Sequence, residues 1–568
     1  MATLQNDRLE ILNKWKECPN LDSEIRKELE SLDSEELFDA FYCDLEFGTG
    51  GMRGVIGAGT NRMNIYTLRS ANYGFGKYLL DQASHPTCVI AYDSRRKSFD
   101  FAKESALVLA SLGVKVYLFD KITPTPELSF AVRYLKATGG IVVTASHNPA
   151  KYNGYKIYDE TGCQLVPDKA SIVINNISGA PDPLTMTLLP YEEAVSQGLI
   201  ETVGKKIDKE YLKCVKSVAL HLHQRKKNFK VVFTSLHGTS AYLGQRLLKE
   251  VGYDFVPVSE QMIPDSEFRT VPLPNPEDKN AFTLAIKYAK ENNADICIAT
   301  DPDADRVGLA VKNGDDYVLL NGNQTGALLI NYLCSEKKIK KTGVVFNTIV
   351  TSPLGAVIAK SHGMETFSTL TGFKYIGEQA TLLEGNKEKE FFFGYEESYG
   401  YVIKDFVRDK DSLQALLLCS EMACFYKNQG KSLLEVLDEI YKKYDYYVED
   451  LVNIALTGAS GAEKIKRILN FFRYQELNND LLKPTSKEDY ELREKIDYAT
   501  KEKSSLTLPK SNVVKYFLDD DSFFVLRPSG TEPKMKVYIS VHRKEEKDAI
   551  SRKEEIKKAV LDIVDSVE

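Results

Sequence analysis

Short apolar runs alternate with amphipathic segments along most of this chain. Between residues 70 and 143, apolar runs at 88–91, 114–119 and 140–143 are separated by segments whose apolar residues recur at helical spacing. Strands that alternate with helices are typical of a mostly parallel sheet covered by helices. The pattern therefore predicts an α/β domain, with any site lying beyond the carboxyl ends of its strands.

The alternation returns twice farther along the chain. Strands are predicted at 230–233 and 295–299, and again at 343–346 and 391–393, with helical segments between them. From about residue 447 the pattern changes to a charged stretch and two strand runs before a C-terminal helix, which favours a smaller α+β domain.

The predicted fold class is therefore α/β with four domains around a central cleft. Three similar α/β domains with mixed, mostly parallel sheets and an α+β domain are expected, at 1–205, 206–320, 321–446 and 447–568. The first 40 residues form a helical extension, in which Asp33-Ser-Glu-Glu36 resembles a capping box that opens a short helix.

The amino-acid composition argues against several classes of protein. The 568 residues are too many for one core, and 43% hydrophobic with 27% charged residues is ordinary for a globular protein. A net charge of -7 argues against a nucleic-acid partner, and no apolar run reaches the ~18 residues of a membrane span. The nine scattered cysteines and the absence of a signal-like start favour a cytoplasmic protein, expected to be a monomer or dimer.

The segment 144–149, Thr-Ala-Ser-His-Asn-Pro, directly follows the predicted strand at 140–143. Asn-Pro is a turn dipeptide, so a plain turn is one interpretation. The other is a nucleophile or phosphate-carrier site, because Ser146 has an imidazole beside it in His147 and an amine ten residues on in Lys156.

Three carboxylates stand at alternate positions in 301–306, Asp-Pro-Asp-Ala-Asp-Arg. Oxygen ligands at this spacing suit Mg²⁺ or Ca²⁺. An EF-hand needs glycine at its sixth position and glutamate at its twelfth, where this chain has Arg306 and Lys312. An acidic surface turn is the remaining alternative to a metal loop.

Six glycines fall within residues 46–59. The spacing does not fit a dinucleotide-binding fingerprint, because Arg53 and Arg62 stand where the third glycine is needed. An arginine among glycines suits an oxyanion or phosphate, although a glycine-rich turn with a solvated arginine is equally consistent.

Two later segments also follow predicted strands. Residues 394–400, Gly-Tyr-Glu-Glu-Ser-Tyr-Gly, offer acceptors and donors for sugar hydroxyls, and 408–411 add a lysine for proton transfer. Each could instead be a charged cap. Residues 527–531, Arg-Pro-Ser-Gly-Thr, form a turn that also provides a cradle for a phosphate dianion.

With these segments together, the chain resembles the α-D-phosphohexomutase superfamily, most of all its phosphoglucomutase branch, which includes enzymes that also act on phosphopentoses. The likeness runs from about residue 40 to the end, with 144–149, 301–306, 396–398 and 527–531 in the family's order, and it extends to 47–64 and 371–377. One departure is Tyr395, where many relatives carry glycine.

The resemblance implies a role for each matching residue. Ser146 would carry a phosphoryl group, and that group with Asp301, Asp303 and Asp305 would hold Mg²⁺. The implied substrate-binding residues are Arg306, Thr371, Gly372, Phe373, Lys374, Glu396, Ser398, Arg527, Ser529, Gly530 and Thr531. Proton transfer and charge stabilisation would be shared by Lys410, His147, Lys156 and Arg53, and we rank Lys410 first among candidate bases.

The implied function is the interconversion of glucose 1-phosphate and glucose 6-phosphate, with glucose 1,6-bisphosphate as intermediate and activator and sugar phosphates as the small-molecule partners. Phosphopentomutase, phosphomannomutase and glucose-1,6-bisphosphate synthase activities are alternatives on the same fold. A non-catalytic phosphosugar-binding protein and a calcium-dependent structural protein are further alternatives; the carrier serine argues against the former because binding alone needs none.

Overall fold

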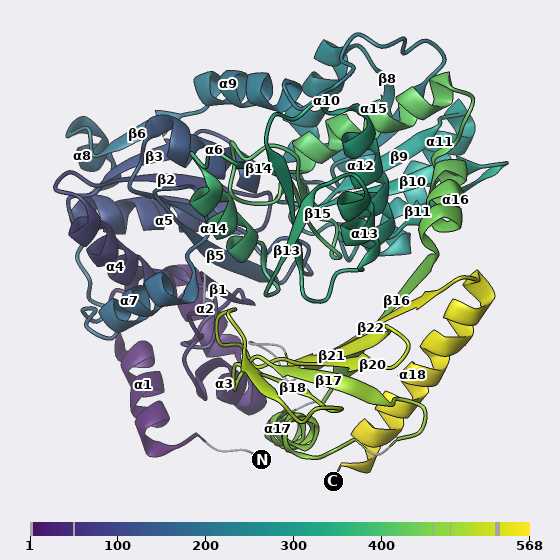
Figure 1. Ribbon diagram of the computed structural model, residues 1–568. Coiled ribbons are helices and arrows are strands. Elements are labelled where there is room, and N and C mark those ends of the chain that lie inside the picture. The colour runs from purple at the N-terminus through teal and green to yellow at the C-terminus, as the bar shows by residue number, and fades with distance from the viewer. Residues whose placement is uncertain (1–3, 49–50, 457, 478, 529–533, 568) are drawn as a thin grey trace. The chain divides into compact units, whose positions relative to one another are not determined.

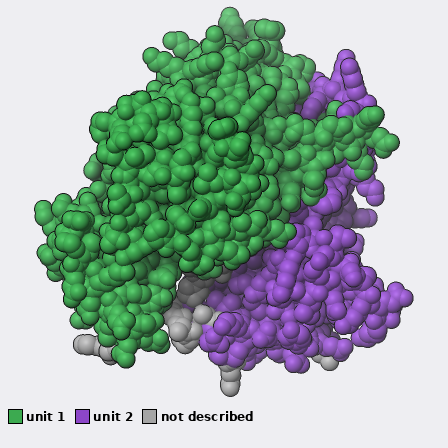
Figure 2. Space-filling view, turned by 90° about the vertical axis from the view of Figure 1, so that its left-hand side faces the viewer, with its two compact units in different colours: residues 1–325, 373–432 green, residues 326–372, 433–568 purple. Residues whose placement is uncertain are grey.

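A computed structural model describes residues 4–48, 51–456, 458–477, 479–528 and 534–567. Figure 1 labels the elements along the chain. The chain forms two compact units, one from residues 1–325 with 373–432 and the other from 326–372 with 433–568, which Figure 2 shows in green and purple.

The first unit contains a six-stranded mixed sheet in the order β1-β5-β4-β2-β3-β6. Its strands are β1 (Gly51–Val55), β2 (Thr87–Tyr92), β3 (Lys115–Phe119), β4 (Gly139–Val143), β5 (Tyr152–Asp159) and β6 (Ile200–Val203). The four strands β4, β2, β3 and β6 run parallel, as the alternating pattern predicts, whereas β5 and β1 add antiparallel pairs at one edge. All five residues of β4 are buried, so a short apolar run indeed marks a central strand.

Helices accompany these strands at the predicted places. They are α4 (Ile65–Gln82), α5 (Ser98–Ser111), α6 (Thr125–Leu135), α7 (Pro167–Ile177) and α8 (Tyr191–Ser196). Of these, α6 packs against β2 and β4. Pro124 precedes α6 and Pro126 lies in its first turn, where a missing backbone N–H costs nothing. The two prolines therefore set where this helix begins.

Two segments that the sequence does not mark as strands belong to this sheet. Within the glycine-rich segment, Gly51–Val55 pairs with β5 as strand β1 and places Arg53 opposite Gly154. Residues 152–156 are the start of β5. The loop therefore closes as a tight β4–β5 connection, and both of its ends are fixed in one sheet.

A second mixed sheet in the same unit has the order β11-β10-β9-β7-β8. Its strands are β7 (Lys230–Thr234), β8 (Asp254–Pro257), β9 (Ile296–Thr300), β10 (Val307–Asn313) and β11 (Asp316–Leu320). The helices are α9 (Lys205–Lys216), α10 (Ser240–Val251) and α11 (Thr283–Asn292), with single 3₁₀ turns at Ser259–Met262 and Lys279–Phe282. The parallel strands are β9, β7 and β8, and a β9–β10 hairpin carries residues 301–306 at its tip.

The remaining part of the first unit brings further polar segments to these sheets. It consists of α14 (Phe373–Leu383), β14 (Lys389–Glu396), β15 (Gly400–Val402) and α15 (Ser412–Asn428). Nearly every residue of α15 is buried, and the helix packs against α9, α10 and β15. A helix that is buried on nearly all sides belongs in a core, and its N-cap residue Asp411 joins it to the 405–411 loop that precedes it.

The second unit is dominated by a seven-stranded antiparallel sheet in the order β16-β22-β21-β20-β17-β18-β19. Its strands are β16 (Tyr446–Ala455), β17 (Pro484–Asp489), β18 (Glu494–Asp497), β19 (Lys503–Ser505), β20 (Val514–Leu518), β21 (Phe523–Pro528) and β22 (Lys534–Arg543), and its helices are α17 (Gly458–Tyr474) and α18 (Glu546–Ser566). The charged stretch 483–503 thus forms strands. This is the expected sheet-rich C-terminal domain.

The same unit holds the parallel pair β12 (Thr342–Thr348) and β13 (Glu365–Thr369), with α13 (Leu354–Ser361) and α16 (Leu433–Tyr444) packed together. The helix α12 (Gly322–Glu336) begins in the first unit and ends in the second. Taken together, the elements form a mixed α/β fold with a C-terminal sheet domain, as predicted.

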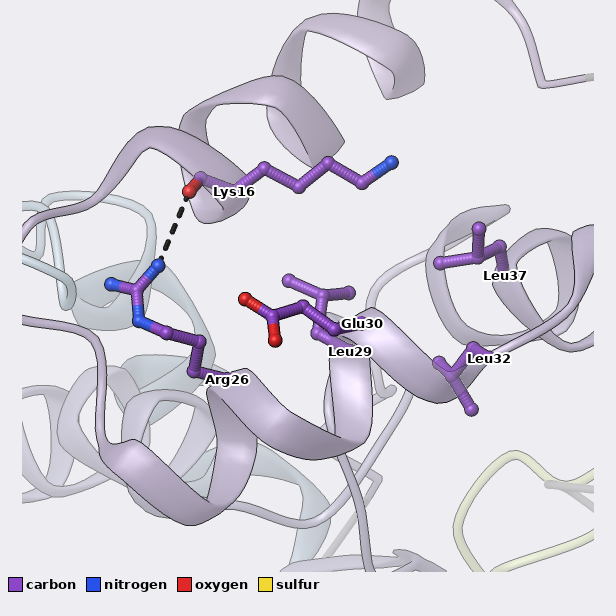
Figure 3. A pocket seen from close by; sticks show the side chains of 6 residues that line it. All are labelled: Lys16, Arg26, Leu29, Glu30, Leu32 and Leu37. Atoms are coloured by element: carbon purple, nitrogen blue, oxygen red, sulfur yellow. Dashed lines mark hydrogen bonds between the residues drawn. The ribbon is translucent and has the colours of Figure 1, made fainter.

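Three helices precede the first sheet: α1 (Asn6–Glu17), α2 (Ser23–Ser31) and α3 (Ser34–Phe41). The capping box is confirmed, since the Asp33 and Glu36 side chains both accept backbone N–H groups. Figure 3 shows an open pocket between these helices, lined by Lys16, Arg26, Leu29, Glu30, Leu32 and Leu37. The guanidinium group of Arg26 donates a hydrogen bond to the carbonyl of Lys16 (3.4 Å). Within the described residues, no helix is long and apolar enough to cross a membrane.

Candidate active site

Ser146 lies at the tip of the β4–β5 connection, beyond the carboxyl end of a central strand. Its φ of +51° is in the left-handed region, and its backbone N–H donates to Thr144 Oγ1 (2.8 Å). The hydroxyl donates to Asp301 Oδ2 (2.7 Å) and lies 3.2 Å from His147 Nδ1. The carrier serine predicted from one loop therefore contacts the metal loop predicted from another.

The metal loop folds back on itself at the end of β9. Asp301 Oδ1 accepts the backbone N–H groups of Asp305 (3.0 Å) and Arg306 (2.9 Å), and Ala304 turns the chain at a φ of +59°. As a result, Asp301, Asp303 and Asp305 each offer a carboxylate oxygen within 4.8 Å of the others, and all three are buried. An acidic surface turn is excluded by this burial.

Two lysines from different segments balance the negative charge of these carboxylates. Lys156, on β5, places its Nζ 2.9 Å from Asp303 Oδ2 and 3.4 Å from Asp305 Oδ2. Lys410 places its Nζ 3.1 Å from Asp305 Oδ2 and 3.2 Å from Asp409 Oδ1. Buried charges persist only when they are paired in this way, so the lysines fix the two aspartates as anions.

Burial and neighbouring charges shift the pKa values of the three aspartates in different directions. Burial works against the charge of Asp305, but Lys410 and Lys156 outweigh it and lower its pKa. The pKa of Asp303 is also lowered, because Lys156 offsets burial and the nearby Asp305 charge. For Asp301, burial together with the charges of Asp305 and Asp303 raises the pKa well above its usual value. A divalent cation would relieve this repulsion.

Two carboxylate oxygens in this cluster are left for a ligand. Asp303 Oδ1 and Asp305 Oδ1 are buried and accept no hydrogen bond from the described residues. Hard carboxylate oxygens are the ligands that Mg²⁺ prefers, and buried oxygens without donors are costly to leave unmatched. The donor set therefore fits a magnesium ion.

His147 and Arg53 lie on the other side of the serine. The pKa of His147 is well below its usual value, because of burial and then the charges of Arg306 and Arg53, so its imidazole is neutral at pH 7. Arg53 donates from Nη1 to Asn148 Oδ1 (3.0 Å) within the same loop. The guanidinium of Arg306 is paired with the carboxylate of Glu277.

Lys410 carries a proton in this environment. Burial opposes its charge, but Asp305, Asp409 and Glu396 outweigh it and raise its pKa. The lysine Nζ lies 5.6 Å from the ring centre of Phe373, and its alkyl chain lies over Gly400. A Cβ at position 400 would come within 2.1 Å of that chain, so only glycine admits the lysine at this place.

The predicted sugar-binding turn joins the same region. Glu396 ends β14 and is buried, Ser398 is half-buried, and the following Gly400 forms a β-bridge with Arg306. Phe373 is buried at the start of α14, and the carbonyl of Lys374 accepts the thiol of Cys163 (3.2 Å).

The other predicted substrate-binding residues belong to the second unit or lie outside the described residues. Thr371 is half-buried, and Gly372 has a φ of +112°, which favours glycine. Arg527, at the end of β21, donates from Nη1 to the hydroxyl of Tyr538 (3.4 Å). Ser529, Gly530 and Thr531 lie outside the described residues.

Family models match three successive parts of the chain. They are phosphoglucomutase/phosphomannomutase α/β/α domain I at residues 44–181, domain II at 209–314 and domain III at 321–444. The chain belongs to the phosphoglucomutase/phosphomannomutase family. A phosphoglucomutase of Staphylococcus epidermidis is 40% identical to it over 512 residues, which cover 89% of this chain and 92% of the relative.

Solved structures share the fold of this phosphohexomutase. A putative phosphomannomutase from Thermus thermophilus matches with a TM-score of 0.67 at 23% identity, covering 91% of this chain and 99% of the other. An N-acetylphosphoglucosamine mutase of Aspergillus fumigatus, solved with GlcNAc-6P and magnesium, matches with a TM-score of 0.50 at 14% identity, covering 99% and 100%. The chain is thus a mutase-type enzyme that transfers a phosphoryl group.

Three residues of this phosphohexomutase contact the site but carry no motif that marks them in the sequence. Arg95 binds the backbone of the serine loop, Thr125 binds Asp303, and Glu277 pairs with Arg306. Arg95 follows β2, the neighbour of β4, so the rule that parallel strands end at a common edge would have placed it near Ser146. Glu277 lies in a proline-rich loop where no periodic signal exists.

Proposed function

We propose that this enzyme interconverts glucose 1-phosphate and glucose 6-phosphate, with Ser146 as the phosphoryl carrier and glucose 1,6-bisphosphate as the intermediate and activator. The observation that carries the proposal is the 2.7 Å hydrogen bond from the Ser146 hydroxyl to Asp301, within a cluster of three carboxylates. A binding protein has no need of a hydroxyl held against such a cluster. The 40% identity to a phosphoglucomutase supports glucose as the sugar.

Asp301, Asp303 and Asp305 would hold Mg²⁺ together with an oxygen of the phosphoryl group on Ser146. The ion, when bound, polarises the transferring phosphoryl group and neutralises part of its charge. Phosphoserine and three aspartates bring about five negative charges, of which a divalent ion cancels two. Lys156, Lys410 and Arg306 are proposed to offset part of the remainder.

Transfer to the substrate breaks the bond between phosphorus and Ser146 Oγ and forms a bond between phosphorus and the free sugar hydroxyl. The sugar hydroxyl loses a proton and the serine oxygen regains one. In the second half-reaction the phosphoryl group at the other end of the sugar returns to Ser146, so the serine hydroxyl loses a proton and that sugar oxygen regains one. Asp301 Oδ2 and His147 Nδ1 lie within hydrogen-bond distance of the serine hydroxyl and are proposed to handle its proton.

Lys410 remains our first candidate for proton exchange with the sugar hydroxyl. Its raised pKa means that it holds a proton at rest, so it acts as the donor in the half-reaction in which a sugar oxygen regains a proton. It accepts a proton only after it has passed its own to an acceptor such as Asp409, 3.2 Å away. Lys156 and Arg53 are proposed to stabilise charge rather than to exchange protons.

The sugar and its distal phosphate are proposed to be held by the remaining predicted residues. Glu396 and Ser398 would bind hydroxyls, and residues 371–374 would orient the ring. Arg527 with Ser529, Gly530 and Thr531 would hold the phosphate that does not react. We also propose the domain limits 1–205, 206–320, 321–446 and 447–568, and a cytoplasmic location.

Intact mass measurement tests the carrier role. We expect one phosphate-sized mass gain after incubation with glucose 1,6-bisphosphate, and no gain in Ser146→Ala. Ser111→Ala is the matched control, because Ser111 donates to a backbone carbonyl within α5 but touches no site residue. A gain that persists in Ser146→Ala, or turnover of that variant near the wild-type rate, would contradict the proposal.

A phosphomannomutase is the second candidate, because the matching family models describe both activities. Coupled assays with glucose 1-phosphate, mannose 1-phosphate and ribose 1-phosphate separate the hexose and pentose substrates. We expect the highest kcat/KM with glucose 1-phosphate. Accumulation of glucose 1,6-bisphosphate from a phosphoryl donor, without net mutase turnover, would instead indicate a bisphosphate synthase.

A further inference from the structure

Arg95 lies beneath the serine loop and binds its backbone at four points. Its Nη1 donates to the carbonyls of Pro149 (3.0 Å) and Tyr152 (3.1 Å), and its Nη2 donates to those of Ser146 and Asn148 (both 2.5 Å). The residue is 3% exposed. The planar fork of a guanidinium group is suited to such paired contacts, which a lysine amine cannot reproduce.

The other edge of the same guanidinium group is held by Asp93. The Arg95 Nε lies 3.3 Å from Asp93 Oδ2, which also accepts the hydroxyl of Thr144 (2.7 Å). Thr144 Oγ1 in turn accepts the backbone N–H of Ser146 (2.8 Å). Arg95 and Asp93 therefore hold the carbonyl and the amide of the same serine, and a residue held at both ends keeps its left-handed φ of +51°.

The flat face of the Arg95 guanidinium group connects the serine loop to the segment that follows β8. Its guanidinium carbon lies 5.0 Å from the ring centre of Phe268. The segment that contains Phe268 is tied to His237, whose Nδ1 is 2.8 Å from the carbonyl of Ile263 and whose Nε2 is 2.7 Å from Thr270 Oγ1. Both ring nitrogens of this histidine are thus used for structure.

The same region supports the metal loop. The turn that holds His237 continues to Thr239, whose backbone N–H donates to the carbonyl of Pro302 (2.8 Å), between Asp301 and Asp303. Arg95 therefore connects the loop that presents Ser146 to the region that supports the aspartates. Both of its Nη atoms donate to backbone carbonyls, so these contacts are with the loop and not with the reacting atoms.

We propose that Arg95 is a positioning residue, which holds the Ser146 hydroxyl in register with Asp301 by binding the carbonyls of the serine loop and stacking on Phe268. The inference rests on the proposed carrier role of Ser146. A displacement of about 1 Å at a reacting atom costs roughly 10²-fold in rate. Loss of the Arg95 guanidinium group should therefore lower kcat.

Arg95→Lys tests this role because it keeps the charge and removes the fork. We expect kcat to fall by roughly 30–100-fold, while KM for glucose 1-phosphate changes by less than about threefold. The rate at which glucose 1,6-bisphosphate phosphorylates Ser146, followed by mass in a single turnover, should fall by the same factor as kcat. A positioning role predicts this match, whereas general loss of stability does not.

Arg473→Lys is the matched control. Arg473 is also a buried arginine, with Asp489 at 2.9 Å and Asn512 at 2.8 Å, but it belongs to the C-terminal sheet domain. We expect a comparable fall in Tm with kcat unchanged. If Arg95→Lys loses Tm but phosphorylates Ser146 at the wild-type rate, Arg95 is structural only and the inference is wrong.

Phe268→Leu provides a second route if Arg95→Lys does not fold. It removes the stacking surface and keeps all four carbonyl contacts, so kcat should fall by about 3–10-fold with KM unchanged. An unchanged kcat would overturn the proposed stacking. The wild-type enzyme separates the two proposals: absence of a mass gain on Ser146 contradicts the carrier role, whereas a gain at the wild-type rate in both variants contradicts only positioning.

Discussion

The first unit buries two clusters of carboxylates, and they differ in their cations. Asp301, Asp303 and Asp305 are matched by Lys156 and Lys410, whose ammonium groups contact the carboxylates directly. The second cluster consists of Glu127 on α6, Asp208 on α9 and Asp411 before α15. Its cation is Lys121, which forms an ion pair with Asp208.

Glu127 in the second cluster keeps a proton that Asp303 and Asp305 in the first cluster give up. Burial, and then the charge of Asp208, raise the pKa of Glu127 well above its ordinary value, and neither Glu127 oxygen accepts a hydrogen bond from the described residues. Burial likewise raises the pKa of Asp411 to about 6, although the hydroxyl of Tyr211 donates to it (2.8 Å). We infer that Glu127 is a neutral acid.

The comparison teaches that burial alone does not make a carboxylate a ligand. Both clusters are inaccessible to water, but two lysines hold Asp303 and Asp305 ionised, whereas Glu127 forms no ion pair among the described residues and keeps its proton. The two meet at helix α6, where Thr125 binds Asp303 (3.0 Å) and Glu127, two residues later, faces Asp208. Substitutions on this helix can therefore separate their roles.

The largest effect is expected from Asp303→Asn. The amide removes one charge and one proposed metal ligand, so kcat with saturating Mg²⁺ should fall roughly 10³-fold, equivalent to about 4 kcal/mol of transition-state stabilisation. Glu127→Gln makes the same chemical change in the second cluster and should leave kcat within about threefold of the wild type. Equal losses in the two variants, measured in a coupled assay, would show that the clusters do not differ in function.

A smaller effect is expected from Thr125→Val, which keeps the shape of the side chain and removes the hydroxyl that donates to Asp303 Oδ2. Residues that hydrogen-bond to a metal ligand typically contribute 10–100-fold in metal affinity. The Mg²⁺ concentration for half-maximal activity should therefore rise by about that factor. The kcat at saturating Mg²⁺ should recover to within a few fold. If excess Mg²⁺ does not restore the kcat of this variant, Thr125 does not act through the metal.

Strand periodicity and the strand-end rule are enough to predict the central part of the site from the sequence. Ser146 and Asp301 each follow a buried apolar strand, and both lie where the sheet geometry places ligands. The β5 strand is not predicted because Tyr152-Asn-Gly has turn chemistry, and β17–β19 are not predicted because many of their half-exposed residues are charged. Local sequence signals for these strands are weaker than the cross-strand pairing that forms them.

The contacts that hold the site together are harder to predict. Arg95 binds backbone carbonyls, which every residue has, so no side-chain motif indicates the contact. The raised pKa of Glu127 depends on its burial and on α6 and α9 packing together, which brings positions 127 and 208 side by side. Long-range packing of this kind produces no periodic pattern in the sequence, whereas the aspartates of the metal loop are neighbours in the chain.

Glu127→Gln also changes how stability depends on pH. The folded protein retains the Glu127 proton above the pKa of about 4.3 that the unfolded chain has, so the wild type binds more protons when folded and loses stability as pH rises above that value. The slope for one proton is at most about 1.4 kcal/mol per pH unit. Glutamine cannot ionise, and its amide can donate to Asp208.

We therefore expect the free energy of unfolding of Glu127→Gln to gain up to about 4 kcal/mol relative to the wild type between pH 5 and pH 8, measured by urea denaturation. Asp208, Lys121 and Asp411 are the other charged groups around this position, and they are the same in both proteins. Parallel pH profiles of the two proteins would show that Glu127 is ionised when folded.

The smallest effect is expected from Lys121→Met, which removes the cation beside Asp208. The side chain of Lys121 is one-third exposed while that of Asp208 is 1% exposed, so solvent screens the pair in part, and we expect a loss of about 1 kcal/mol at pH 7. Lys115→Met is the control, because Lys115 pairs with Glu201 at 2.9 Å with both side chains exposed, and it should cost less than about 0.5 kcal/mol. Urea denaturation of both variants measures the difference, and equal losses would mean that the burial of Asp208 adds nothing to its ion pair.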